Sequence, residues 1–201
     1  MAPMQQSALL HTGTHRFLWL VPLLLIAGCA QPVQRVDSLA QRCFYAASIA
    51  ADVKTTPEAR ADTCDTALLT IALSRRDQAA TYTNRGIVRL NQSAYEHAKK
   101  DFDEAVRLAP EIGEPYVNRA AALLALHRYN EAINDLDRAI QLNPSSIEKA
   151  YYNRAIAREK SNDIKGAYAD YLKAAELRPD WKLPREDLQR FKVITRSRRL
   201  A

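Results

Sequence analysis

Glycine and cysteine are both scarce in this chain, which has 5 Gly and 3 Cys among 201 residues. A collagen-like repeat needs glycine at every third position, and a small disulfide-held scaffold needs many more cysteines. Hydrophobic residues make up 47% of the chain, which is too many for a low-complexity disordered segment. The composition therefore predicts a globular domain that buries a core without metals or many disulfides.

An excess of charge of one sign is also missing from most of the chain, although the formal net charge is +6. Between Lys182 and Ala201 there are 7 Lys or Arg and 2 Asp or Glu, whereas residues 29–181 carry 21 residues of each sign. A neutral body with a basic end lacks the broad positive field that draws a protein onto nucleic acid. We therefore expect no nucleic-acid partner.

Side chains with catalytic chemistry are few. After residue 28 the histidines are His97 and His127, and neither has a partner at metal-ligand spacing, so both are predicted to be surface residues. Carboxylates such as those of Asp101, Asp103 and Asp135 alternate with Lys and Arg, which indicates solvated helix faces carrying i,i+4 pairs. We expect neither an enzyme nor a metal or other cofactor.

A short apolar run near the N-terminus predicts a targeting segment. Phe17–Ile26 is a run of ten residues without a charge, whereas a helix needs roughly 20 to cross a bilayer. With Arg16 before this run and small residues after it, residues 1–28 are predicted to be a secretory signal peptide. Residues 26–29, which read IAGC, resemble the bacterial lipobox, and this resemblance implies that Cys29 carries a lipid. The alternative is an ordinary signal peptide followed by an incidental cysteine.

The lipobox resemblance also implies a location. Each buried CH₂ of an acyl chain adds ~0.8 kcal/mol of membrane affinity, so two or three chains anchor a protein permanently. The chain is then held in the bacterial cell membrane or the outer membrane through its lipid. Its folded part is expected in the periplasm, with residues 29–37 as a short tether.

From Tyr82 onward, similar residues recur at an offset of 34 to 35 positions. The recurring sets are Tyr82, Gly86, Ala98, Phe102, Ala105 and Pro110, then Tyr116, Ala120, Ala132, Leu136, Ala139 and Pro144, then Tyr151, Ala155, Ala167, Tyr171, Ala174 and Pro179. Ala98, Phe102 and Ala105 have the i, i+4, i+7 spacing of one helix face. Each proline ends a helix, because it lacks an N–H. The period therefore predicts stacked pairs of helices.

These recurring positions resemble the tetratricopeptide repeat family. The resemblance implies an all-α fold, a right-handed superhelix of antiparallel helix pairs. The repeats span residues 79–112, 113–147 and 148–181. Arg85, Arg119 and Arg154 depart from the family pattern, which commonly has Leu there, and we interpret this as a helix face that is partly hydrated.

Less regular segments flank the repeats. Residues 38–76 predict a degenerate helical hairpin, in which Cys64 has the spacing of the bulky residue in the later repeats. In an oxidising compartment Cys43 and Cys64 are expected to form a disulfide, and the alternative is two buried thiols. Residues 182–201 predict a capping helix and a basic tail, which either lies on anionic lipid or is simply hydrated.

The family resemblance further implies that fixed positions on the first helix of each repeat face a concave groove. One of these positions is asparagine in all three repeats, as Asn84, Asn118 and Asn153. Because an amide both donates and accepts, such a row can pair with the main chain of an extended peptide. The alternative is that the amides bond between helices and hold the stack in register. The other groove residues predicted in this way are Ile87, Tyr152, Lys149 and Glu114.

Repeats of this family that bind cytosolic heat-shock chaperones present a Lys-Asn-Asn-Lys-Arg carboxylate clamp. The corresponding residues here match at two of five positions, and they are Thr83, Ile87, Asn118, Lys149 and Asn153. A chaperone C-terminal carboxylate is therefore not the expected ligand. The sequence predicts a membrane-anchored adapter or scaffold for an envelope protein or an extended peptide segment. The alternatives are an enzyme or accessory acting on envelope polymers such as peptidoglycan, and a structural spacer.

Overall fold

The computed structural model of this chain describes residues 41–44, 47, 57–70 and 72–198. The chain divides into Met1–Gln31 and Pro32–Ala201, and every described residue belongs to the second unit. The predicted signal peptide, the lipobox with Cys29 and the tether therefore lie outside the described residues.

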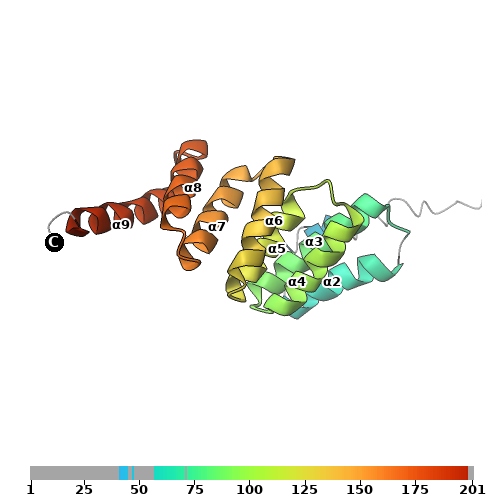
Figure 1. Ribbon diagram of the computed structural model, residues 1–201. Coiled ribbons are helices and arrows are strands. Elements are labelled where there is room, and N and C mark those ends of the chain that lie inside the picture. Colours follow the sequence, from blue (N-terminus) through green and yellow to red (C-terminus); the bar gives the residue numbers. More distant parts are fainter. Residues whose placement is uncertain (1–40, 45–46, 48–56, 71, 199–201) are drawn as a thin grey trace, which may run out of the picture. The chain divides into compact units, whose positions relative to one another are not determined.

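The described residues form helices joined by turns, without a strand. The helices are α2 (Pro57–Thr70), α3 (Arg75–Asn91), α4 (Tyr95–Leu108), α5 (Glu114–Ala125), α6 (Tyr129–Leu142), α7 (Ile147–Lys160), α8 (Ile164–Leu177) and α9 (Lys182–Arg198), labelled in Figure 1. Three antiparallel pairs, α3 with α4, α5 with α6 and α7 with α8, coincide with the three predicted repeats. The predicted all-α stack of helix pairs is confirmed.

Neighbouring pairs pack through both of their helices. The second helix of each pair contacts the first helix of the next, so that α4 lies on α5 and α6 lies on α7. The first helices also contact one another, because α5 touches both α3 and α7. Equivalent positions on α3, α5 and α7 therefore form rows that run across the stack. These rows position the candidate site.

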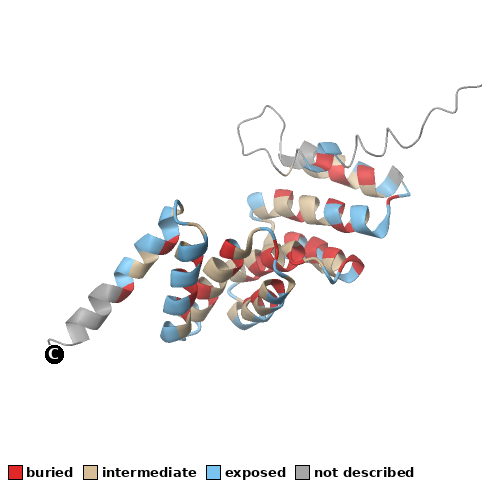
Figure 2. Ribbon diagram, turned by 90° about the horizontal axis from the view of Figure 1, so that it is seen from above, coloured by how far each residue is buried: buried red, intermediate tan, exposed pale blue. Residues whose placement is uncertain are grey.

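The core consists of small residues set around one large residue in each pair. In the first repeat Ala98, Phe102 and Ala105 are completely buried on one face of α4. The equivalent residues of α6 and α8 are buried to the same extent, and in Figure 2 the buried positions follow the helix faces that point into the stack. Alanine lets two helices approach closely, and the bulky residue fills the space that remains.

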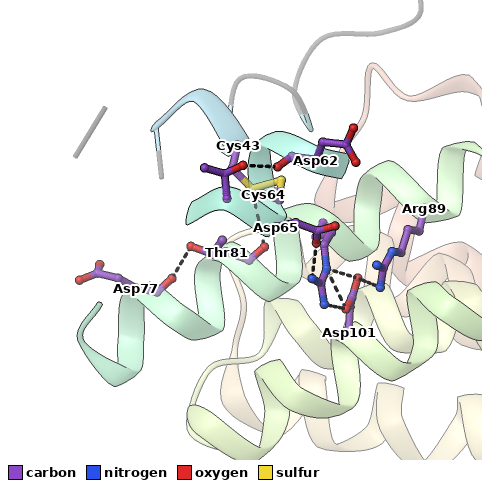
Figure 3. Close-up of a disulfide and its surroundings, with 10 residues drawn as sticks. Cys43, Asp62, Cys64, Asp65, Asp77, Thr81, Arg89 and Asp101 are labelled. Atoms are coloured by element: carbon purple, nitrogen blue, oxygen red, sulfur yellow. Dashed lines mark hydrogen bonds and ion pairs between the residues drawn. A yellow bond between two sulfur atoms is a disulfide. The ribbon is translucent and has the colours of Figure 1, made fainter. Parts of the chain in front are cut away.

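A disulfide holds the N-terminal end of the stack. Cys43, which lies in the helical residues 41–44, is bonded to Cys64 of α2, with Cα atoms 4.8 Å apart (Figure 3). Neither cysteine is exposed, and α2 packs against α3. Because the side chain of Ser74 accepts a hydrogen bond from the Asp77 N–H at 3.2 Å, α3 begins at Arg75, four residues before the repeat pattern does.

At the other end, α9 packs against α8. Pro184 and Phe191 are the residues through which α9 is buried, and most of the remaining described residues of α9 are exposed. This fits the predicted capping helix, which covers one apolar face while showing charge outward. The helix extends to Arg198, and the side chains of the basic tail lie outside the described part.

The first repeat has a glycine where the other two have alanine, and the packing explains why. A Cβ at Gly86 would lie 2.5 Å from Cε1 of the Phe102 ring and 2.8 Å from Cδ1. We expect Gly86→Ala to lower the free energy of unfolding by about 1 kcal/mol, because overpacking costs roughly 1–3 kcal/mol and alanine returns about 1 kcal/mol of helix propensity. The measurement is urea unfolding.

The matched control adds Phe102→Leu, which reproduces the Ala120 and Leu136 combination of the second repeat. The smaller side chain removes the clash. The double variant should therefore lose less free energy of unfolding than the two single variants lose together. Strictly additive losses would contradict this account of the packing.

Candidate peptide-binding surface

Three asparagines lie in one row across the first helices of the repeats. Asn84, Asn118 and Asn153 occupy equivalent positions of α3, α5 and α7, and each is half-buried. Because α5 contacts both α3 and α7, the row runs from one repeat to the next. The structure therefore brings the three predicted residues together on neighbouring helices.

The amides of these asparagines are not engaged with any other residue in the described part of the chain. Among the residues that the structure describes, none of the three side chains forms a hydrogen bond with another residue. The alternative in which they bond between helices and hold the stack in register finds no support in this arrangement. Each amide keeps two N–H donors and a carbonyl acceptor for water or for a ligand.

Two isoleucines near this row, the predicted Ile87 and its equivalent Ile156 in the third repeat, are half-buried. Ile87 packs against the core formed by Ala98, Phe102 and Ala122, and Ile156 packs against the core around Tyr171. Both isoleucines thus contribute to the stack while keeping part of their surface accessible. An extended chain lying along the asparagines would meet mixed polar and apolar surface.

Glu114 is already engaged within the chain. Its Oε1 accepts hydrogen bonds from the backbone N–H and the hydroxyl of Ser145, both at 2.9 Å. Burial acts to raise the pKa of Glu114, but the hydrogen bonds from Ser145 outweigh it and the pKa is lowered. Lys149, by contrast, is exposed. Of the two charged residues predicted in the groove, the lysine is exposed, whereas the glutamate already accepts two hydrogen bonds within the chain.

Tyr152 is covered by the C-terminal helix. Its hydroxyl donates to Oδ2 of Asp187 on α9 at 3.0 Å, and its ring lies 4.7 Å from that of Trp181 and 5.6 Å from that of Tyr171. The structure therefore places this predicted groove residue in the contact between α9 and the last repeat. Burial, followed by the hydrogen bond to Asp187, raises the pKa of Tyr152 to about 12.

The arginine after each asparagine joins three helices. Nε and Nη2 of Arg119 on α5 donate to the two carboxylate oxygens of Asp135 on α6, at 2.7 and 2.6 Å. Nη1 of the same residue donates to Asp103 of α4, in the preceding repeat, at 3.0 Å. The hydrogen bond with Asp135 raises the pKa of Arg119 against the opposing effect of burial. A buried bidentate pair of this kind fixes geometry as well as charge.

The same bridge recurs in the other two repeats. The pairs are Arg85 with Asp101 and Asp65, and Arg154 with Asp170 and Asp137. Figure 3 shows the first of them, in which Asp65 comes from α2. Since Asp65 follows Cys64 as Asp103 follows Phe102, α2 joins the stack in the register of the second helix of a repeat. Each bridging arginine also lies 5.2–5.4 Å from the ring centre of the tyrosine three residues before it.

These bridges refine one sequence-based interpretation and correct another. The arginine face is only partly hydrated, because 14–19% of each side chain is exposed and the guanidinium is held in ion pairs. Asp101 and Asp135 are buried and pair between helices, so the prediction of solvated i,i+4 pairs is wrong for both, although Asp103 does pair with Lys99 in that way at 2.9 Å. The sequence contained a usable signal, since an aspartate follows each arginine at a spacing of 16 residues.

Leucines stand at the positions of the bridge in the last contact of the stack, between α8 and α9. Leu172 of α8 follows Tyr171 as Asp103 follows Phe102, so leucine stands where the earlier repeats have the second aspartate. On α9, Leu188 stands nine residues after Pro179, as Arg119 stands nine residues after Pro110. Leu188 packs against the core that contains Tyr171 and Phe191. The ion-pair series therefore ends at α8.

Side chains that could bind a metal ion or act as catalysts are few in the described part of the chain. No group of three or more His, Cys, Asp or Glu side chains is arranged there to hold a metal ion. Both predicted surface histidines are exposed, and Nδ1 of His127 lies 2.8 Å from the Tyr129 hydroxyl. The geometry suits binding through hydrogen bonds and shape.

Comparison with known proteins identifies the repeats. One family model described as tetratricopeptide repeat matches residues 114–146, and a second with the same description matches residues 79–112 and 148–180. These matches confirm the three predicted repeats, with boundaries that differ by at most one residue. Among curated proteins no relative matches the chain.

Several solved structures share this fold. The TPR domain of Arabidopsis OM64 is 28% identical, with a TM-score of 0.56, over 58% of this chain and 95% of that one. The second TPR domain of human RPAP3, solved in complex with an HSP70 peptide, is 27% identical, with a TM-score of 0.55, over 59% of this chain and 98% of that one. MamA from Desulfovibrio magneticus RS-1 covers 82% of this chain and 86% of its own length, at 19% identity and a TM-score of 0.65, and shows likeness of fold alone.

The raised pKa of Tyr152 makes the cap sensitive to alkaline pH. Its pKa lies above the ordinary value of about 10, so the contribution of Tyr152 to stability is complete below about pH 10 and is lost as the pH rises through about 12. We expect Tyr152→Phe to remove this part of the alkaline loss, because the variant has no hydroxyl to ionise beside Asp187. The measurement is thermal unfolding as a function of pH.

Ultraviolet absorbance of tyrosinate provides the second readout. The wild-type chain should show a tyrosine that ionises near pH 12 and is missing from the variant. If wild type and Tyr152→Phe lose the same stability between about pH 10 and 12, the hydroxyl does not couple α9 to the last repeat.

Proposed function

We propose that this chain, which contains three tetratricopeptide repeats, is a membrane-anchored adapter that holds an extended segment of a partner protein. Its repeats and its structural neighbours support a role in protein–protein interaction. The proposal has three further parts. They are the surface that binds the partner, the lipid that anchors the chain, and the bacterial envelope as its location.

The observation that supports the binding surface is the row of three amides that have no hydrogen-bond partner among the described residues. Asn84, Asn118 and Asn153 stand at equivalent positions of neighbouring helices, and within the described residues none of them bonds to the chain. An extended peptide presents N–H and C=O groups at regular intervals, and an amide can pair with either. Such a row recognises main chain in preference to a particular side chain.

The ligand is proposed to differ from the HSP70 peptide bound by the human RPAP3 domain. A clamp for a C-terminal carboxylate needs several cations, and this chain has Thr83 and Ile87 at the first two clamp positions. Of the five positions, Asn118 and Lys149 match the clamp. We therefore propose an internal extended segment of a partner, bound through its backbone.

Two features support the envelope as location. Residues 26–29 resemble a lipobox, and the disulfide between Cys43 and Cys64 fits an oxidising compartment such as the bacterial periplasm. In the part of the chain that the structure describes, no helix is long and apolar enough to cross a bilayer. Under the proposal the lipid on Cys29 supplies the attachment.

Substitution of the asparagine row tests the binding surface. We expect the triple variant Asn84→Ala, Asn118→Ala, Asn153→Ala to recover at least about tenfold less crosslinked partner from the envelope. The reason is that each lost hydrogen bond contributes about 1 kcal/mol. The readout is quantitative pull-down of the full-length chain after crosslinking in cells.

The matched control replaces three exposed polar side chains outside the row, as Lys100→Ala, Gln141→Ala and Gln189→Ala. Both triple variants should unfold at the wild-type temperature, because among the described residues the six side chains form one hydrogen bond, the long one of 3.4 Å that Gln141 accepts from exposed Arg138. Equal partner recovery from the asparagine variant and the control would defeat the groove assignment and favour a structural spacer.

Labelling with palmitate tests the anchor. Expressed in a bacterium with two membranes, the full-length chain should incorporate labelled palmitate and sediment with membranes. Cys29→Ser should do neither, because the acceptor thiol is gone. An unlabelled wild-type chain released into the periplasm would show that residues 1–28 act as an ordinary signal peptide.

A further inference from the structure

The second repeat lacks an arginine that the first and third repeats both have. In those repeats the buried aspartate accepts from a second guanidinium, one helical turn after the bridging arginine. The two pairs are Arg89 with Asp101 and Arg158 with Asp170, each at 2.8 Å. Figure 3 shows the first pair. The corresponding residue of the second repeat is Leu123, and Asp135 accepts from Arg119 alone within the described residues.

A cleft of about 270 Å³ lies where that guanidinium is missing. Besides Asp135, its walls are formed by Lys99, Asp103, Arg119, Leu123, Glu131 and Asn134. Leu123, which replaces the arginine, is part of the wall, while Glu131 and Asn134 are exposed and give access from solvent. We call this space the Asp135 cleft.

The unused acceptor positions in the cleft belong to Asp135. Three carboxylates and two cations line the cleft, but Glu131 is paired with Arg128 at 2.7 Å, and both lining cations are already paired as well. Lys99 is held by Asp103 at 2.9 Å, and Arg119 is shared between Asp103 and Asp135. A carboxylate can accept about four hydrogen bonds, and Asp135 accepts two. A buried carboxylate with unused acceptor capacity in an open cleft is a recognition element for a donor group.

We infer that the Asp135 cleft binds the guanidinium of an arginine side chain presented by a partner polypeptide. The sister repeats show the chemistry, because the same aspartate position takes a second arginine in both of them. Arginine suits the site better than lysine, since its planar donors match a carboxylate edge.

The surroundings fit a polypeptide better than a free small molecule. A second cleft, of about 400 Å³, also borders on Glu131 and continues over the turns that contain His127 and Ser161. Residues on either side of an inserted arginine therefore have surface to lie on. Both clefts involve α6, and the Asp135 cleft also has walls from α4 and α5. None of the three asparagines lines either cleft, so this inference stands independently of the proposed groove.

Binding of blocked amino acids tests the chemistry. The probes are N-acetyl-arginine amide, N-acetyl-lysine amide and a short peptide with one arginine between glycine and serine residues. They are titrated into the detergent-solubilised full-length chain and followed by NMR. We expect a saturable shift of the Asn134 side-chain amide with blocked arginine and at least about tenfold weaker binding of blocked lysine, because lysine cannot form the bidentate pair.

Filling the cleft from within provides the first variant. Leu123→Arg introduces the arginine of the sister repeats and should weaken binding of blocked arginine by at least about tenfold. The matched gain-of-binding variant is Arg89→Leu, which gives the first repeat the residue of the second and should create a second saturable site beside Asp101. This second variant keeps the test decisive even if Leu123→Arg does not fold.

Three results would overturn the inference. They are the absence of a saturable shift in the wild-type chain, equal affinity for blocked arginine and lysine, and undiminished binding by folded Leu123→Arg. The arginine peptide tests the source of the guanidinium, since a polypeptide partner predicts that it binds at least about tenfold more tightly than the blocked amino acid. Equal affinity for the two would assign the cleft to a free guanidinium compound and overturn the polypeptide part of the inference.

Discussion

The arginine in the middle of each first helix is the group that fixes how the helices of this stack meet. Its guanidinium bonds to an aspartate of its own repeat and to an aspartate of the preceding unit, so three helices share one charge. Loss of one partner of such a buried pair costs about 3–5 kcal/mol, because the remaining charge is stranded. Three bridges in succession, at Arg85, Arg119 and Arg154, set the offset between neighbouring repeats. The row of asparagines inherits its alignment from that offset, since each asparagine immediately precedes a bridging arginine.

Much of the fold could be predicted from the sequence, because small and bulky residues at fixed spacing carry strong steric information. Ala98, Phe102 and Ala105 identified a helix face, and all three are completely buried. The environments of the charged residues were harder to predict, since the sequence alone does not distinguish an aspartate on a hydrated face from one buried in an ion pair. Asp101 became interpretable only when its position was compared with that of Arg85, on a different helix.

For the candidate site, the sequence placed the asparagine row but not its surroundings. Helix periodicity locates a residue on a face, whereas the partners of a side chain depend on segments far away in the chain. Tyr152 meets Asp187 on α9, and Glu114 meets Ser145 in the turn before α7. Neither contact has a local signature. The Asp135 cleft was equally hidden, because it arises from one substitution, Leu123, in a series of otherwise similar repeats.

The replacement of the bridge by Leu172 and Leu188 bears on how a chain of this kind can grow. A unit duplicated between α6 and α7 would find Asp137 ready for its own arginine and would offer an aspartate to Arg154 in turn. The same unit inserted between α8 and α9 would keep the aspartate of its own repeat but would set its arginine beside Leu172, without the second aspartate that the other arginines have. Gene duplication can therefore lengthen this array from the inside while its C-terminal boundary stays where it is.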